Sequence, residues 1–189
     1  GVMLHDFSQT PDGVETMFAT NLLNHYYLTE RLIAAEVLRP DSMVINVSSG
    51  GLYLAPLRVE SLNTQSADEH HGTRSYTLQK RAQAVLSNHW QSKHRNGPSF
   101  YTMHPGWADT QGVQNSLPTF RKLTSFILRN AEQAADTIQW LAATRPKPLK
   151  ELWFDRKARP LHVYKFTQTS GASESRVAEY LDGFLPSLD

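Results

Sequence analysis

The amino-acid sequence predicts an α/β domain built around a parallel sheet. Two patterns support this: segments whose apolar residues recur every three or four positions alternate with short β-branched runs, and the first two runs are followed by small residues or Pro-Gly. With 40% hydrophobic and 20% charged residues, and 19 Lys and Arg against 18 Asp and Glu, the composition indicates neither disorder nor nucleic-acid binding. The absence of cysteine excludes disulfides, cysteine-ligated zinc and a thiol nucleophile.

The first predicted element is a helix over Thr10–Arg39. Its apolar residues recur with the period of an amphipathic helix, Asp12 and Glu15 form a potential capping box, and a proline follows the last residue. The run Ser42–Gly51 comes next and is typical of a buried strand that ends in a turn. Residues 52–73 are polar and without clear period, so we predict a loop there.

The second half of the chain continues the alternation. A helix is predicted over Ser75–Arg95 and a strand over Ser99–His104, and an Asn-Gly-Pro break separates them. The remaining predicted elements are a helix, a strand and a terminal helix, over Ala131–Ala143, Leu152–Asp155 and Glu174–Phe184.

Tyr76 and Lys80 lie in the second predicted helix, where positions four apart share a face. A positive charge roughly 5 Å from the phenol, at an effective dielectric constant near 20, is worth about 3 kcal/mol. It would lower the pKa of the tyrosine from about 10 to about 8, which is within the range of a general base. Taken alone, such a pair is more often an exposed helical tyrosine and lysine without a catalytic role.

Other polar groups are predicted to gather near this pair. Ser48 and Ser49 end the first strand, and Pro105-Gly106 and Thr110 follow the second, so they should meet at the carboxyl edge of the sheet, where open parallel sheets bind ligands. Asn21 lies on the apolar side of the first helix, where an unpaired amide is costly. A buried amide at a helix kink explains Asn21 equally well, and a turn hydroxyl explains Ser49.

This ordered set resembles the short-chain dehydrogenase/reductase family. The motifs FATN with Asn21, INVSSGG with Ser49, YTLQK with Tyr76 and Lys80, and HPGWADT come in the family's order, and Asn21 precedes Ser49 by 28 positions. The resemblance covers residues 1–155 and implies the C-terminal part of a Rossmann-type doubly wound parallel sheet with flanking helices. We expect one domain over 1–189, with a core part, 1–155, and a C-terminal extension and helix, 156–189.

The resemblance implies an NAD(P)-dependent oxidoreductase that interconverts an alcohol and a carbonyl by hydride transfer. Tyr76 would be the general acid or base, Lys80 would lower the pKa of the tyrosine and bind the cofactor ribose, and Ser49 would hydrogen-bond the reacting oxygen. Asn21 would hold a water that links Lys80 to solvent. The residues implied to bind the cofactor, with NADP slightly favoured over NAD, are Gly1, Tyr76, Lys80, Pro105, Gly106 and Thr110.

The chain departs from the family pattern in three places. The interval of 27 residues from Ser49 to Tyr76 is longer than the shortest family pattern, and Gln79 replaces a small residue before the lysine. The opening GVM resembles the tail of the family's N-N-A-G motif, so the glycine-rich turn and the residue that sorts NAD from NADP would precede Gly1. We therefore expect a fragment of an oxidoreductase, with an exposed apolar edge along Met43–Val47.

Other functions have weaker support. The run INVSSGG departs from the hydrolase elbow G-x-S-x-G at Asn46. The adjacent His70 and His71 lack a zinc spacing, so no metal site is expected. The remaining alternative is a shortened, non-catalytic interaction module that cannot bind cofactor alone and acts by pairing with another subunit. The resemblance implies a homodimer through the helices predicted over 10–39 and 75–95.

The predicted substrate is a small apolar alcohol or carbonyl. Apolar residues follow the second strand, where the family carries its substrate-covering segment, although an ordinary helix core would explain them too: Trp107, Leu117, Phe120, Phe126 and Ile127. No stretch approaches the roughly 18 to 20 apolar residues that span a bilayer, and no signal-peptide pattern opens the chain. We expect an intracellular, cytoplasmic protein, with peripheral membrane association as the alternative.

Overall fold

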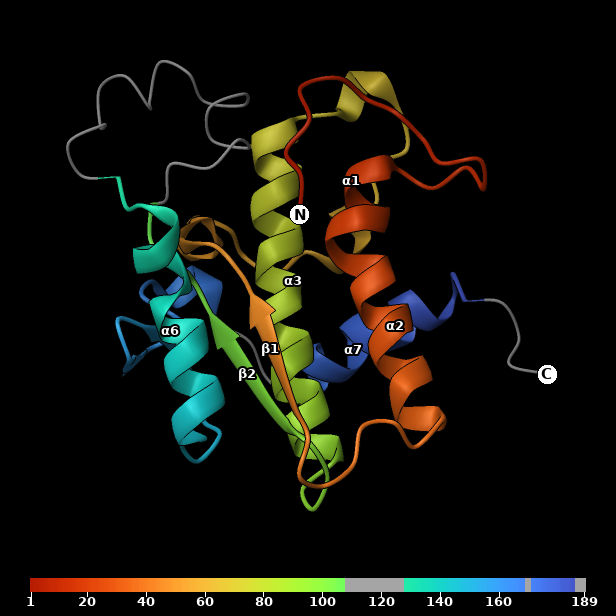
Figure 1. The fold of residues 1–189 in the computed structure, drawn as a ribbon. Coiled ribbons are helices and arrows are strands. Elements are labelled where there is room, and N and C mark those ends of the chain that lie inside the picture. Colours follow the sequence, from red (N-terminus) through yellow and green to blue (C-terminus); the bar gives the residue numbers. More distant parts are fainter. Residues whose placement is uncertain (108–127, 169–170, 186–189) are drawn as a thin grey trace.

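The computed structural model describes residues 1–107, 128–168 and 171–185, and it confirms the α/β class. Figure 1 shows three layers, with helix α6 on one side of the sheet and helices α3, α2 and α7 on the other. Parallel strands joined by helices give the expected partial Rossmann-type fold.

The sheet has the strand order β1-β2-β3-β4. Its strands are β1 (Met43–Val47), β2 (Ser99–Met103), β3 (Leu152–Phe154) and β4 (Lys157–Arg159). The first three are parallel, and β4, which the sequence analysis did not predict, runs antiparallel to β3. Val47 pairs with Met103, so β1 and β2 end at the same edge of the sheet and the residues after them lie side by side.

The first helical stretch is shorter than the predicted 10–39. It consists of α1 (Thr16–Phe18), a π-helical turn η1 (Ala19–Leu23) and α2 (Asn24–Ala34). The predicted capping box is wrong, because Glu15 is itself the N-cap and its carboxylate accepts from the backbone N–H groups of Met17 and Phe18. Gly13 has a positive φ of 76°, so the chain turns just before the helix starts.

Helix α3 is the centre of the fold (Figure 1). Thirteen of its 22 residues are buried, because the sheet covers one side while η1, η2 and α7 cover others. Helix α3 spans Gly72–Lys93, and the described residues also form helices α6 (Ala131–Thr144) and α7 (Gly171–Asp182). Their short 3-10 turns are η2 (Gly50–Leu54), η3 (Val59–Ser61), η4 (Ala67–Glu69) and η6 (Lys165–Thr167).

Alternating residues of β2 supply the two faces of the core. Phe100 packs into the cluster on the α3 side, whereas Tyr101 and Met103 pack against α6. The C-terminal helix α7 belongs to the larger cluster through buried side chains such as Leu181. The Tyr26 hydroxyl also donates to Asp182 at 2.7 Å, so α7 is part of the main core.

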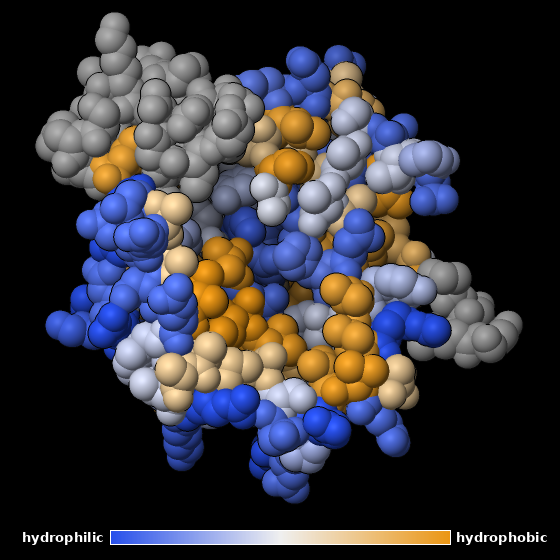
Figure 2. Space-filling model, viewed as in Figure 1, coloured by the Kyte–Doolittle hydropathy of each residue, from blue (hydrophilic) through white to orange (hydrophobic). Residues whose placement is uncertain are grey.

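Strand β1 forms one edge of the sheet, and the expected exposed apolar edge is present. Met43, Val44 and Ile45 are only partly buried, and Val47 is 38% exposed. Figure 2 shows hydrophobic surface over β1, between α6 and α2. In the described ranges, no helix combines the length and apolar character needed to cross a bilayer.

Candidate functional site

The two serines after β1 have different partners. Ser48 is buried, and its hydroxyl donates to the backbone carbonyl of Lys80 at 2.9 Å, which ties the end of β1 to α3. Ser49 is the N-cap of η2, where its Oγ accepts from the N–H of Gly51, and its side chain is placed to hydrogen-bond Tyr76, which lowers the pKa of the phenol. Ser49 is therefore the serine in contact with the tyrosine.

Tyr76 and Lys80 share one face of α3, as their spacing predicted. The Lys80 ammonium lies over the tyrosine ring, 5.7 Å from its centroid. Together with the hydrogen bond from Ser49, this contact brings all three residues to the carboxyl edge of the sheet. Parallel sheets commonly bind ligands at that edge.

The electrostatic prediction for Tyr76 is wrong in direction. Burial raises the pKa of Tyr76 above its ordinary value, and the hydrogen bond with Ser49 opposes this increase only in part. The prediction counted the charge of Lys80 but omitted the lost hydration of the phenolate. Lys80 is itself buried, which lowers the pKa of its ammonium to about 8. The phenol is therefore protonated at neutral pH.

Two acceptors hold the Lys80 ammonium. Its Nζ donates to the carbonyl of Val47 at 2.9 Å and to Oε1 of Gln83 at 3.1 Å. Nε2 of Gln83 in turn lies 3.2 Å from Nδ1 of His25 on α2. Sequence reasoning missed both residues, although Gln83 follows Lys80 by three positions and so shares its helix face. The contact with His25 joins two helices and has no sequence signal.

Asn21 is fully buried in the π-helical turn, and its side-chain amide makes three hydrogen bonds to protein groups. Oδ1 accepts from the N–H of Val2 at 2.6 Å, while Nδ2 donates to the carbonyl of Val2 at 2.8 Å and to Oε1 of Gln79 at 2.9 Å. Both amide hydrogens are used, so this side chain has none left to donate to a water. Asn21 therefore holds the first residues of the chain in place through the backbone of Val2.

Gly1 lies against Asn21 and Lys80. A Cβ atom at Gly1 would be 2.8 Å from Oδ1 of Asn21 and 3.2 Å from Nζ of Lys80, so a side chain does not fit there. Gln79, noted above as a departure from the family pattern, is also fully buried and donates to the carbonyl of Leu62 at 3.2 Å. It therefore supports Asn21 from inside the core.

The Pro-Gly pair follows β2 beside the serine turn. Gly106 has a positive φ of 79°, and its N–H donates to Nδ1 of His104 at 3.0 Å. Burial lowers the pKa of His104 to about 4, and its ring stacks on Phe154 with centroids 4.3 Å apart. A Cβ atom at Gly50 would be 3.8 Å from this imidazole, which places Pro105 and Gly106 next to the serine turn.

Several predicted residues lie outside the described part of the chain. They are Thr110, expected near the cofactor, and four residues of the expected substrate-covering segment, Leu117, Phe120, Phe126 and Ile127. Trp107, the first residue of that set, is described and is 55% exposed.

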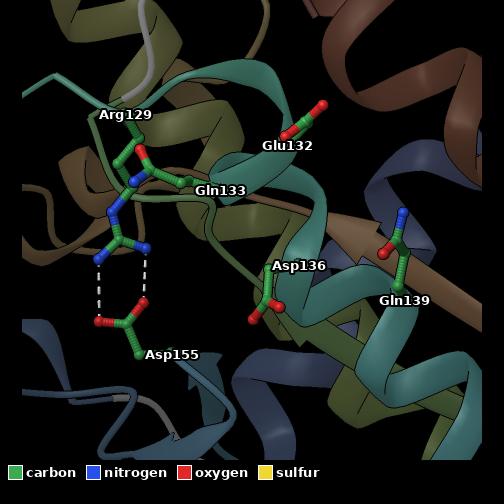
Figure 3. Close-up of a pocket in the computed structure, with 6 residues that line it drawn as sticks. All are labelled: Arg129, Glu132, Gln133, Asp136, Gln139 and Asp155. Carbon is green, nitrogen blue, oxygen red and sulfur yellow. Dashed lines mark hydrogen bonds and ion pairs between the residues drawn. The ribbon is translucent and has the colours of Figure 1, made fainter.

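A polar cavity of about 740 Å³ lies beside α6 and is lined by Arg129, Glu132, Gln133, Asp136, Gln139 and Asp155 (Figure 3). Its charges are largely paired, because Arg129 binds Asp155 with two hydrogen bonds and Asp136 binds Arg156 likewise. None of the predicted catalytic residues line this cavity. Within the described ranges, no three His, Asp or Glu residues are grouped as metal ligands.

Sequence similarity places the chain in the short-chain dehydrogenase/reductase family, which agrees with its partial Rossmann-type fold. It is 38% identical over 190 residues to dehydrogenase/reductase SDR family member 12 of Bos taurus and 37% identical over 186 residues to that of Homo sapiens. Each alignment covers 96% of this chain and 58% of the relative, so the chain spans little more than half of these proteins.

A more distant similarity extends to retinol dehydrogenases. Retinol dehydrogenase 11 of Homo sapiens is 28% identical over 149 residues, which cover 76% of this chain and 46% of that protein. No protein-family model matches the chain.

Proposed function

We propose that the protein is an NAD(P)-dependent oxidoreductase that interconverts an alcohol and a carbonyl, with Tyr76 as general acid or base. One observation carries the proposal: Ser49 is placed to hydrogen-bond Tyr76, while the Lys80 ammonium lies 5.7 Å from the centre of the same ring. These three groups, at the carboxyl edge of a parallel sheet, can hold and protonate an oxygen atom.

The residues present fit a dinucleotide at this edge. Lys80 uses two of its three N–H donors on Val47 and Gln83, which leaves one for a ribose hydroxyl. Gly1 leaves the space next to that ammonium free of side-chain atoms, and Pro105 and Gly106 border the serine turn. The bound nicotinamide would supply or accept the hydride. Thr110 completes the proposed set.

Side chains of the protein would position the substrate oxygen and exchange the proton with it. Ser49 would hydrogen-bond the substrate oxygen, and the Tyr76 hydroxyl would exchange a proton with it. Because burial keeps the pKa of Tyr76 high, the phenol is a proton donor at neutral pH, the form needed to reduce a carbonyl. Oxidation of an alcohol would need the phenolate, which the Lys80 charge would help to stabilise once the site is filled.

The test uses the intact protein, NADH and NADPH, and a panel of apolar aldehydes, ketones and alcohols. Tyr76→Phe should lower kcat by about a hundredfold or more while dinucleotide binding persists. The matched control is Tyr27→Phe, because Tyr27 is an exposed tyrosine on α2. Unchanged turnover in the Tyr76 variant would remove the proposed mechanism. The apolar substrate class is supported by the similarity to retinol dehydrogenases.

A second candidate is a non-catalytic interaction module. The open edge of β1, with partly buried Met43 and Ile45 and exposed Val47, favours it because an unpaired apolar edge can bind another strand. Titration of NADPH fluorescence separates the two candidates, since an oxidoreductase must bind the dinucleotide. A homodimer through α2 and α3 stays a prediction, with exposed Tyr27 and Leu28 on the α2 side.

We also propose that residues 1–189 form one domain. Buried residues of α7 share a cluster with those of α2 and α3, which supports a single folding unit. One cooperative unfolding transition, seen alike by fluorescence and circular dichroism, is the expected result.

A further inference from the structure

We propose that Gln83 and His25 are positioning residues that hold the Lys80 ammonium beside Tyr76, through a hydrogen-bonded chain that requires His25 to be neutral. Neither residue was expected from the sequence. The effect of these hydrogen bonds on catalysis rests on the proposed function, whereas their effect on the pKa of Lys80 does not.

The orientation of the Gln83 amide follows from the chemistry of its neighbours. Gln83 is 1% exposed, and one end of its amide lies 3.1 Å from Nζ of Lys80. An ammonium only donates hydrogen bonds, so the end that faces Lys80 must be the carbonyl oxygen. The other end, the NH₂ group, therefore faces Nδ1 of His25 at 3.2 Å. Nδ1 must accept, which places the His25 proton on Nε2.

Protonation of His25 is incompatible with this arrangement. A second proton on the ring would make Nδ1 a donor and set it against the NH₂ group of Gln83. Rotating the amide would relieve that contact but would turn the NH₂ group toward the Lys80 ammonium. Without rotation the hydrogen bond between Gln83 and His25 is lost, and with rotation Lys80 loses an acceptor and is held by Val47 alone.

Burial and the nearby charge of Lys80 keep His25 neutral. Burial lowers the pKa of His25, and the positive charge of Lys80 on α3 lowers it further. Among the described residues, the titratable side chains near Lys80 are Tyr76 on its own helix and His25 on α2, and β1 contributes the Val47 carbonyl. The acceptor that Gln83 supplies is therefore a main stabiliser of the Lys80 ammonium.

Two substitutions at Gln83 should move the pKa of Lys80 in opposite directions. Gln83→Leu removes an acceptor from a buried ammonium, so the pKa of Lys80 should fall below its wild-type value. Gln83→Glu places a carboxylate where the amide oxygen was, so the pKa should rise. The control is Gln91→Leu on the same helix, because Oε1 of Gln91 accepts from the N–H of Phe100 and does not touch Lys80.

The experiment is an NMR titration of the intact protein with ¹³Cε-labelled lysine, the Lys80 signal being assigned by its absence in Lys80→Arg. The proposal requires a lower midpoint in Gln83→Leu, a higher one in Gln83→Glu and the wild-type midpoint in Gln91→Leu. Equal midpoints in all four proteins would overturn it. The ¹⁵N chemical shifts of His25 test the proposal in the wild-type protein alone. An unprotonated Nδ1 supports the proposed hydrogen bond from Gln83, and a protonated Nδ1 at neutral pH contradicts it.

Activity then tests the catalytic consequence separately. Loss of a hydrogen bond to a charged group predicts that kcat of Gln83→Leu falls by about tenfold or more at neutral pH, while Gln83→Glu shifts the basic limb of the pH profile upward. If the wild type binds and turns over no dinucleotide, the proposed function fails while the Lys80 titrations still decide the positioning role. If the wild type is active and the Gln83 variants show wild-type profiles, the positioning role in catalysis is refuted.

Discussion

Replacing Lys80 by methionine removes a buried ammonium while keeping much of the volume of the side chain. Lys80 is 4% exposed, and burial lowers its pKa from 10.5 to about 8. In the unfolded chain the pKa stays near the ordinary value, so the unfolded state binds more protons between these two pH values. The charged lysine therefore destabilises the folded protein below pH 8, and that cost disappears as the pH rises toward 10.5.

The size of this effect follows from the same two pKa values. A difference of about 2.5 between 10.5 and 8, at about 1.4 kcal/mol per pKa unit, corresponds to about 3.5 kcal/mol in full. About 2 kcal/mol of it is recovered between pH 7 and pH 9.5. Wild-type stability should therefore rise relative to Lys80→Met over this window, whatever offset the lost hydrogen bonds to Val47 and Gln83 introduce.

Urea unfolding of both proteins at half-unit steps from pH 6.5 to pH 10 measures this difference directly. The variant keeps every other titratable group, so the contributions of groups that do not interact with Lys80 cancel in the subtraction. His25, whose pKa Lys80 lowers, titrates below the window in which the gain is expected. We expect a flat difference below pH 7.5 and a steady gain for the wild type above it. Parallel stability curves over the whole range would show that Lys80 is not desolvated in the folded state, and would refute the reasoning.

Four further predictions concern other residues of the fold. Gly13→Ala should cost about 1 kcal/mol of unfolding free energy, because φ is 76° and nothing lies within 4 Å of the new Cβ. Gly106→Ala should cost more in the same urea assay, since its Cβ would also lie 2.8 Å from Arg129; equal losses would contradict this. Asn21→Leu leaves three hydrogen-bonding groups unpaired and should lower the free energy of unfolding by about 2 kcal/mol. A change within about 0.5 kcal/mol would be inconsistent with the role of Asn21 in holding the first residues. His104 should stay neutral until the pH nears 4, and an NMR midpoint above 6 would argue against its burial.

The sequence predicted the secondary structure best where periodicity was long and turn residues were distinct. The helix Ala131–Thr144 and the strand Ser99–Met103 differ from the predicted ranges by one residue each. The first helix was overextended at both ends, because Gly13 and Glu36 have positive φ values of 76° and 54°, a backbone conformation that no helix continues through whatever the sequence pattern. Strand β4 has only three residues and little apolar character, so its pairing with β3 left no sequence signal.

The site was predictable to the extent that helix spacing and strand ends determine it. Ser49, Tyr76 and Lys80 could be expected at one edge because each follows a strand or shares a helix face. The pKa of Tyr76 was not predictable, since desolvation depends on what η2 and the rest of the chain place over the ring. Contacts between separate elements, such as Gln83 with His25, depend on packing that periodicity does not encode.

Ser48 and Ser49 contact different residues, and this limits how the segment from Val47 to Gly50 can change in length. Ser48 anchors the end of β1 to α3, and Ser49 one residue later contacts Tyr76. Adding or deleting a single residue between Val47 and Gly50 would bring the wrong hydroxyl to the tyrosine or none at all. Variation in length among related proteins should therefore fall in residues 55–71, beyond η2, where the two 3-10 turns η3 and η4 replace regular structure and α3 has not yet begun.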